Sequence, residues 1–353
     1  MNASPSHPLG PAPSPRGGAE HVVVVGGGIS GLAAAWFLLS HPQKALRVTV
    51  FEEAARLGGK LYADEFAGVP VDLGAESLLA VRPEAVDLAK AVGLEEDLEP
   101  PVTAEARLWT RGALRPMPKG HVMGVPGDLA PLAASGVLSP RGLARIPLDH
   151  ILPRTPMHED VAVGAYVAAR VGREVVDRLV EPLLGGVYAG DAYRISMRAA
   201  VPQLYAAARR KRSLIEAVRS LQQGAKAGPP SSPSGRFGGP GPVFTGIRGG
   251  IGRLPQAVAE ACRTAGARIE TGTAVRCLRR AGRAGWQLVV HGPQGRRVVD
   301  ADAVVLAVPA PAASSLLAAE APRAAAKLAS IEYASMALVT MAFRRRDMAV
   351  LPG

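Results

Sequence analysis

Apolar residues near the start of the chain fall into two kinds of run. Val22–Val25 is a β-branched run bounded by glycines, which predicts a short strand buried on both faces, as in a parallel sheet. Residues 29–39 are apolar and alanine-rich, which predicts a helix, and residues 47–51 predict a second strand. This order of strand, glycine turn, helix and strand predicts an α/β unit built on a parallel sheet.

The middle of the chain has a helical pattern. From about residue 139 to 222, apolar residues recur three and four positions apart. Within this region Glu181–Asp191 contains three glycines and a tyrosine, which predicts a loop between helices against which a large ligand could lie; an ordinary helix end and turn is the alternative. The predicted helices are 142–151, 161–171, 173–184 and 213–222.

Strands and helices alternate again after residue 243. The α/β unit therefore begins at residue 21, is interrupted by a long insertion and resumes near residue 246. The remaining predicted strands are 69–73, 107–110, 113–115, 243–245, 268–270, 274–278, 303–307 and 334–343, and the remaining predicted helices lie between Pro83 and Gly93, at 251–264 and at 311–320.

Glycines follow the first predicted strand in the spacing G-x-G-x-x-G, at Gly26, Gly28 and Gly31. Such a turn places free N–H groups and the positive end of a helix dipole beside backbone that carries no Cβ, so a pyrophosphate can approach closely. In a chain with 40 glycines the turn could serve packing alone. Glu52, however, ends the second predicted strand about 20 residues later, where a dinucleotide-binding fold places the acid that binds a ribose.

A second glycine turn follows this acid. Arg56, Gly58, Gly59 and Lys60 form R-x-G-G-K. This pattern resembles the one found after the ribose acid in two-domain FAD oxidases, where the turn and its basic side chain lie beside the cofactor phosphates. A nicotinamide-dependent dehydrogenase, which remains an alternative, has no need of it.

Composition narrows the remaining function classes. The 353-residue chain is 48% hydrophobic, enough for a sizeable core, and its net charge of +11 would attract nucleic acid, an anionic membrane surface or an acidic substrate. No basic stripe interleaved with aromatic residues appears, so nucleic acid is not expected as a partner. Residues 1–20 and 224–242 are rich in Pro, Gly and Ser, which predicts a disordered tail and a low-complexity loop.

Cysteine and histidine usage predicts neither a disulfide framework nor a metal site. Cys262 and Cys277 are the only cysteines, and the seven histidines do not recur at metal-ligand spacing. The sequence shows neither a signal peptide nor an apolar run of the ~18 residues that a membrane span needs. We expect a cytoplasmic protein.

Longer motifs resemble the flavin-dependent coproporphyrinogen III and protoporphyrinogen oxidases of haem biosynthesis, within the amine-oxidase-like FAD superfamily. The resemblance covers residues 21–343 without the low-complexity loop. GGGISGL at 26–32, RLGGK at 56–60, GGIGRLP at 249–255 and DAVVLAVP at 302–309 match the superfamily, and the porphyrinogen oxidases are matched by DLGAESLL at 72–79 and by the long segment 172–204, which contains GGVYAGD.

The resemblance implies a fold and a set of site residues. The fold class is α/β, with an FAD-binding Rossmann-like domain interrupted by a mixed α+β substrate domain that has a helical subdomain. The residues implied in substrate binding are Arg82, Gly185, Gly186, Val187 and Tyr188, with Arg82 pairing a propionate. Those implied in FAD binding are Gly26, Gly27, Gly28, Ile29, Ser30, Gly31, Glu52, Glu53, Arg56, Gly59, Lys60, Gly74, Ala75, Glu76, Ser77 and Val275, of which Gly74 to Ser77 line the flavin and Val275 meets the adenine.

The resemblance also implies the chemistry. Coproporphyrinogen III would be oxidised to coproporphyrin III by hydride transfer to FAD, with oxygen as the final acceptor, so no protein nucleophile is required and no catalytic base is identifiable. Protoporphyrinogen IX is the alternative substrate; the positive charge favours the one with four carboxylates. The helical subdomain would contact membranes peripherally, as it can in the family. An amine oxidase, a carotenoid desaturase and a non-catalytic Rossmann binding module remain alternatives.

The expected domain organisation follows the family. We expect a tail at 1–20, FAD-binding segments at 21–80 and 246–312, substrate-domain segments at 81–112 and 313–353, a helical subdomain at 113–222 and the loop at 223–245. The family continues beyond the strand expected at 334–343, whereas this sequence stops at Gly353. If the polypeptide ends there, we expect FAD to be held weakly or not at all, and the 353-residue chain to be inactive.

Overall fold

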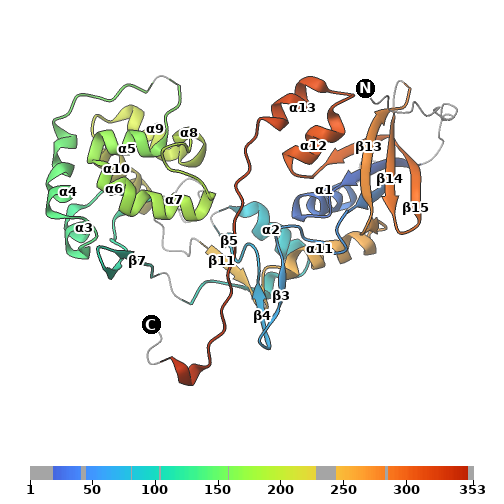
Figure 1. Ribbon diagram of the computed structural model, residues 1–353, viewed down its shortest axis with the longest axis horizontal. Coiled ribbons are helices and arrows are strands. Elements are labelled where there is room, and N and C mark those ends of the chain that lie inside the picture. Colours follow the sequence, from blue (N-terminus) through green and yellow to red (C-terminus); the bar gives the residue numbers. More distant parts are fainter. Residues whose placement is uncertain are drawn as a thin grey trace, which may run out of the picture.

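The computed structural model of the protein describes residues 19–40, 45–80, 82–102, 105–157, 159–227, 244–282 and 285–348. The predictions for residues 1–18 and 228–243 lie outside these ranges. The described chain forms two lobes joined by a narrow middle layer (Figure 1). One lobe holds the parallel sheet and the other is helical.

The parallel sheet is built around the valine run. β1 (Glu20–Val25) pairs in parallel with β2 (Leu46–Phe51) on one side and with β16 (Ala303–Leu306) on the other, and β12 (Arg268–Glu270) extends the sheet beyond β2. β-branched side chains in a central strand are covered on both faces, and Val23 and Val24 are fully buried. The predicted α/β fold with a Rossmann-like sheet is confirmed.

Two different layers cover the sheet. Helices α1 (Ile29–Ser40) and α11 (Arg253–Thr264) pack on one face, where Val24, Val48 and Val50 join their core. An antiparallel meander of β13 (Ala274–Arg280), β14 (Trp286–Gly292) and β15 (Gly295–Ala301) covers the other face. Successive strand residues point to opposite faces, so β1, β2 and β16 each contribute to both cores.

The helical lobe is formed by the insertion. It has one core of buried apolar residues, to which Val167, Leu179, Leu204 and Ile215 belong. Its helices are α3 (Leu129–Ser135), α4 (Pro140–Arg145), η2 (Ile146–His150), α5 (Val163–Val171), α6 (Arg173–Val175), η3 (Val176–Val180), α7 (Glu181–Tyr188), α8 (Met197–Ala200), α9 (Pro202–Arg210) and α10 (Leu214–Ala227), and its hairpins are β7 (Arg107–Thr110) with β8 (Ala113–Pro116) and β9 (His121–Val122) with β10 (Val125–Pro126).

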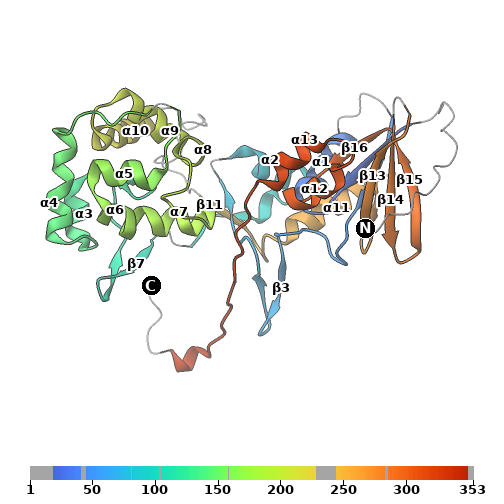
Figure 2. The same ribbon diagram turned by 45° about the horizontal axis from the view of Figure 1, so that its top comes forward.

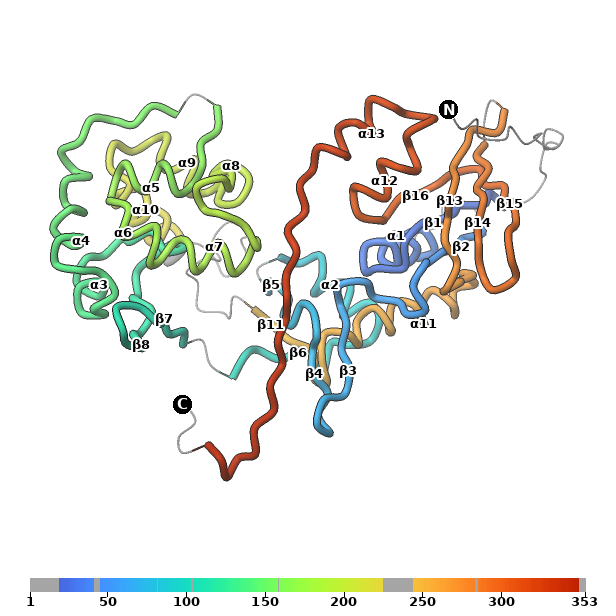
Figure 3. Tube along the Cα trace, in the orientation of Figure 1, coloured from blue at the N-terminus to red at the C-terminus, as the bar shows by residue number. Residues whose placement is uncertain are grey.

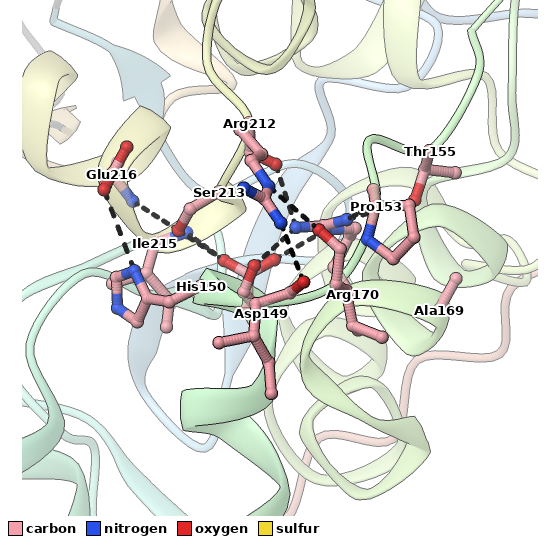
Figure 4. Close-up of polar contacts among 12 residues, drawn as sticks. Asp149, His150, Pro153, Thr155, Ala169, Arg170, Arg212, Ser213, Ile215 and Glu216 are labelled. Atoms are coloured by element: carbon pink, nitrogen blue, oxygen red, sulfur yellow. Dashed lines mark hydrogen bonds and ion pairs between the residues drawn. The ribbon is translucent and has the colours of Figure 1, made fainter.

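A buried ion pair crosses this lobe (Figure 4). Arg170 of α5 donates from Nε to Asp149 of η2 at 2.6 Å, and both side chains are almost completely buried. The guanidinium also donates to the carbonyl oxygens of Asp149, Pro153 and Arg212. The other Asp149 oxygen accepts from the Ser213 hydroxyl and from the amide of Ile215, at the start of α10. The pair therefore ties η2, α5 and α10 together.

The predicted loop at 181–191 was wrong in its first half. Gly185 and Gly186 lie inside α7, which continues the helical run that begins at Arg173, and only residues 189–191 turn away. Leu184 is fully buried and holds the helix against the core, while the amide of Ala189, at φ 50°, donates to the carbonyl of Gly185. Tertiary packing has overridden the low helix propensity of the glycines.

The middle layer consists of short strands. β3 (Ala63–Phe66) and β4 (Val69–Asp72) form a hairpin, and β11 (Phe244–Ile247) pairs with both β5 (Leu78–Leu79) and β6 (Leu98–Glu99). Helix α2 (Pro83–Ala91) and the 3₁₀ turn η1 (Glu95–Asp97) complete it. Figure 3 shows the chain passing between the lobes through this layer, which brings β11 beside strands from far earlier in the sequence.

The last described residues leave the lobe that holds the parallel sheet. Helices α12 (Ala310–Leu317) and α13 (Pro322–Ala329) pack together, and residues 331–344 then run in an extended form between the lobes to η5 (Arg345–Asp347) (Figure 2). The strand predicted at 334–343 was wrong for this structure, because no described strand pairs with the segment. Met336, Val339 and Phe343 are accordingly exposed. Within the described ranges, no helix is long and apolar enough to cross a membrane.

Candidate functional site

The carboxyl ends of three parallel strands meet at the glycine turn. The amide of Gly26 donates to the carbonyl of Phe51, at the end of β2, at 2.8 Å. Ala307, just after β16, donates to the carbonyl of Val25, also at 2.8 Å. In open α/β sheets, ligands usually bind at the carboxyl ends of the parallel strands, where neighbouring strands connect in opposite directions.

Gly26 and Gly31 are required by the protein's own packing. Gly26 has φ +111°, and a Cβ there would lie 2.6 Å from the carbonyl oxygen of Ala307. A Cβ on Gly31 would lie 1.9 Å from the carbonyl oxygen of Gly26, closer than any real contact. These two glycines let α1 start directly against the strand ends.

Gly28 differs, because the protein leaves the space beside it open. A Cβ on Gly28 would have only the Cα of Gly59 within 4 Å, at 4.0 Å. The two glycine turns lie side by side: Gly28 and Gly58 form a parallel bridge, and Gly58 donates to the carbonyl of Gly27 at 2.9 Å. Bare backbone from two turns thus meets at the start of α1, whose first N–H groups have no partner within the helix. This geometry suits a phosphate group.

Glu52 reaches back to the same turn. Its Oε2 accepts from the Gly27 amide at 2.6 Å and its Oε1 from the Ala54 amide at 2.8 Å. Each carboxylate oxygen keeps a further lone pair that could accept from a ribose hydroxyl. The half-buried Glu52 carboxylate is therefore fixed in the place predicted for the ribose acid.

Glu53 and Val275 lie on the meander side of Glu52. The Glu53 carboxylate pairs with Arg276 at 2.8 Å, and both side chains are mostly exposed. Val275 is half-buried in β13, where the pairing with β14 shifts register between Val275 and Cys277. The Glu52 carbonyl accepts from the amide of Thr273, which brings the start of β13 to the end of β2.

The two basic residues of R-x-G-G-K have different surroundings. Arg56 donates to the carbonyl of Gly59 at 2.9 Å, and its guanidinium stacks 4.2 Å from the ring centroid of Tyr62. Arg56 also lines a cavity of about 580 Å³ between its turn, β3 and α11. Lys60 is exposed, with its ammonium 5.7 Å from the ring centroid of Tyr333.

The turn at residues 74–77 is attached to the second glycine turn. A Cβ on Gly74 would lie 2.1 Å from the carbonyl oxygen of Lys60, and the same oxygen accepts from the amide of Ala75. Ala75, Glu76 and Ser77 are exposed. The backbone contact keeps this turn beside the predicted phosphate site with three residues open to solvent.

Asp72 has a positioning role that the sequence reasoning missed. Its Oδ2 accepts from the amide of Ile251 at 3.0 Å and its Oδ1 from that of Gly252 at 3.3 Å, just before α11. This aspartate, 179 residues away in the sequence, thus holds the turn that leads into α11. Only the fold shows that DLGAES and GGIGRLP, at 249–255, form one unit.

The predicted substrate residues lie away from the glycine turns. Arg82 is exposed at the start of α2 in the middle layer, and Gly185 to Tyr188 lie on α7 in the helical lobe (Figure 1). Val187 and Tyr188 are 56% and 47% exposed, and the Tyr188 hydroxyl donates to the carbonyl of Ala200. Both residues thus remain accessible on the helical lobe.

Ionisable groups of the described chain form no metal cluster of three or more His, Cys, Asp or Glu side chains. Close to the second turn, a hydrogen bond from Arg253 lowers the pKa of Asp97, and a hydrogen bond to Asp64 raises the pKa of Tyr62. Both pKa shifts are caused by hydrogen bonds to exposed side chains, those of Arg253 and Asp64. Among the described residues, the feature that suits a nucleotide is therefore the pair of glycine turns with Glu52, not these two titratable groups.

Comparison with known proteins agrees with this geometry. The model of the flavin containing amine oxidoreductases matches residues 29–350. Coproporphyrinogen III oxidase of Propionibacterium freudenreichii is 35% identical over 94% of this chain, and that of Mycobacterium bovis is 37% identical over 90%. The chain spans 65% of the length of each of these relatives.

A solved structure from Exiguobacterium sp. 255-15, described for a protoporphyrinogen oxidase, aligns with a TM-score of 0.71 at 29% identity, over 87% of this chain and 63% of that one. Cyclohexylamine oxidase of Brevibacterium oxydans, at 18% identity and a TM-score of 0.55, shares the fold. The chain belongs to the family of flavin-containing amine oxidoreductases.

Proposed function

We propose that the chain binds FAD at the carboxyl edge of its parallel sheet. The observation that carries this proposal is the open space at Gly28, framed by Gly59 and by the fixed carboxylate of Glu52. Gly26 to Gly31 and Gly59 would hold the pyrophosphate, Lys60 would supply positive charge, and Glu52 would bind the ribose. The exposed residues Ala75 to Ser77 would flank the flavin, and Val275 the adenine.

The reaction proposed is the oxygen-dependent oxidation of coproporphyrinogen III to coproporphyrin III. Bound FAD would accept hydride from the substrate and would pass the electrons on to oxygen. The protein would bind and orient the cofactor and the substrate. Support comes from the relatives named for this reaction and from a net charge of +11, which suits a substrate with several carboxylates.

Protoporphyrinogen IX oxidation is the second candidate, supported by the description of the Exiguobacterium structure. We infer that either porphyrinogen would lie between the middle layer and the helical lobe, within reach of Arg82 and of residues 185–188. The domain boundaries expected from the sequence and a peripheral membrane contact of the helical lobe are part of this proposal.

The cofactor proposal is tested with Gly28→Ala. The new methyl group makes only an ordinary 4.0 Å contact with the Cα of Gly59 in the ligand-free protein, but it fills the space assigned to the pyrophosphate. We expect FAD affinity, measured by titration of flavin fluorescence, to fall at least about 10-fold, with urea unfolding of the ligand-free protein unchanged.

Gly224→Ala is the matched control, because Gly224 also has nothing within 4 Å of its added Cβ but lies on α10 in the helical lobe. It should leave FAD affinity unchanged. Both variants are made in the full-length natural protein. The proposal fails if that protein shows no saturable binding of FAD, or if Gly28→Ala binds as tightly as wild type.

The substrate proposal is tested in the full-length natural protein by following the fluorescence of the aromatic product. Faster turnover of coproporphyrinogen III than of protoporphyrinogen IX supports the first candidate. The reverse order supports the second.

A further inference from the structure

Tyr333 lies between two parts of the candidate site that are far apart in the sequence. Its ring centroid is 5.7 Å from the ammonium of Lys60, in the second glycine turn. Its hydroxyl oxygen accepts from the amide of Ala310 at 2.8 Å, where α12 begins after β16. One side chain therefore contacts both the phosphate-side turn and the segment after the strand that pairs with β1.

The start of α12 needs such an acceptor. Pro309 precedes the helix and offers no side-chain cap, and Pro311 carries no N–H. The amide of Ala310 is thus the first donor of this helix. The Tyr333 hydroxyl satisfies it from outside the helix, which fixes Tyr333 against the carboxyl edge of the sheet.

The ring in turn limits the freedom of Lys60. A lysine side chain is flexible, and part of its rotamer entropy is lost when it binds an anion. The aromatic face of Tyr333 attracts the Lys60 ammonium and so restricts the conformations of the lysine side chain before an anion binds. The neighbouring pair of Arg194 and Glu332 cannot replace this effect, because both side chains are more than two-thirds exposed.

We propose that Tyr333 is a positioning residue of the dinucleotide site, which holds the Lys60 ammonium ready for the phosphates while its hydroxyl anchors it to α12. The inference rests on the proposed binding of FAD. It assigns a role in the nucleotide site to a residue that lies 273 positions after Lys60, beyond α13 and outside every nucleotide motif of the sequence.

The test separates the ring from the hydroxyl. Tyr333→Leu removes both and should weaken FAD binding about 3-fold to 5-fold in a fluorescence titration. Tyr333→Phe keeps the ring and should bind FAD within about 2-fold of wild type, while it lowers the midpoint of thermal unfolding of the ligand-free protein through the lost cap. In a Lys60→Met background, Tyr333→Leu should have no further effect on FAD affinity.

Tyr193→Leu is the matched control. The Tyr193 ring lies 5.6 Å from the guanidinium of Arg173, nearly the same distance as in the Tyr333 pair, but in the helical lobe. It should leave FAD affinity unchanged. The inference is overturned if Tyr333→Leu binds FAD like wild type, if Tyr193→Leu weakens binding equally, or if Tyr333→Leu acts independently of Lys60. Absence of FAD binding by the full-length wild-type protein would instead refute the proposed function.

Discussion

The helical lobe and the edge of the parallel sheet are built on opposite principles. In the helical lobe even charged groups are buried and satisfied by the protein, as Asp149 and Arg170 show. At the sheet edge, polar backbone is left near open space at Gly28, and the carboxylate of Glu52 keeps lone pairs free. The first region satisfies its buried charges internally, whereas the second leaves room and free acceptors beside bare backbone, where we propose that a ligand binds.

The strongest test of this contrast is Arg170→Met. Removing the guanidinium leaves the Asp149 carboxylate buried without its charge partner, which should lower the free energy of unfolding by about 3–5 kcal/mol. Urea unfolding followed by circular dichroism measures the loss. Arg173→Met is the control, since Arg173 is 78% exposed and pairs with Asp177 at 3.5 Å. If both variants lose the same free energy of unfolding, the burial of the Arg170–Asp149 pair does not account for its contribution to stability.

Gly31→Ala should have the next largest effect. The methyl group would overlap the carbonyl oxygen of Gly26, so α1 would have to move away from the strand ends. We expect a loss of about 3 kcal/mol in the free energy of unfolding, together with loss of FAD binding. This distinguishes Gly31 from Gly28, whose alanine variant should keep its stability. Normal stability of Gly31→Ala would show that the turn is less tightly packed than the structure indicates.

Glu52→Gln should have a smaller effect. A glutamine has one acceptor oxygen, so its NH₂ group would face the amide of either Gly27 or Ala54. We expect FAD affinity to fall about 10-fold, since a charged acceptor is lost and the side chain is displaced. Glu260→Gln, which changes an exposed carboxylate on α11, should bind FAD normally. If Glu52→Gln binds FAD as tightly as wild type, Glu52 is not part of the FAD site.

The smallest effect is expected for Glu332→Ala. This change breaks the 2.8 Å pair with Arg194, which joins the segment after α13 to the loop between α7 and α8. Because both side chains are exposed, the free energy of unfolding should change by less than about 0.5 kcal/mol. A loss above about 1 kcal/mol would mean that the lobes depend on this contact far more than its exposure suggests.

Much of the fold could be predicted from local pattern. The valine run, the glycine spacing and the apolar helix after it specify β1 and α1 almost to the residue, because burial on both faces and close backbone approach restrict which residues fit. The position of Glu52 followed from spacing alone. The longer motifs also indicated the flavin-containing family, which the comparison of residues 29–350 confirmed.

Other features depended on contacts across the chain. Helix α7 includes Gly185 and Gly186 because Leu184 packs into the core, and residues 334–343 form no strand because none of the described strands pairs with them. No local pattern indicated that Asp72 would hold the turn before α11 or that Asp149 would pair with Arg170.

The sequence by itself determined which residues could form a nucleotide turn, since glycine spacing and β-branched runs act over neighbouring positions. Only the tertiary structure decided that Gly28 faces open space while Gly31 does not, and that Tyr333 stands beside Lys60. The room beside Gly28 depends on the second glycine turn at Gly59, and the ring contact joins residues 273 positions apart; the relative placement of such segments is not encoded by any local pattern.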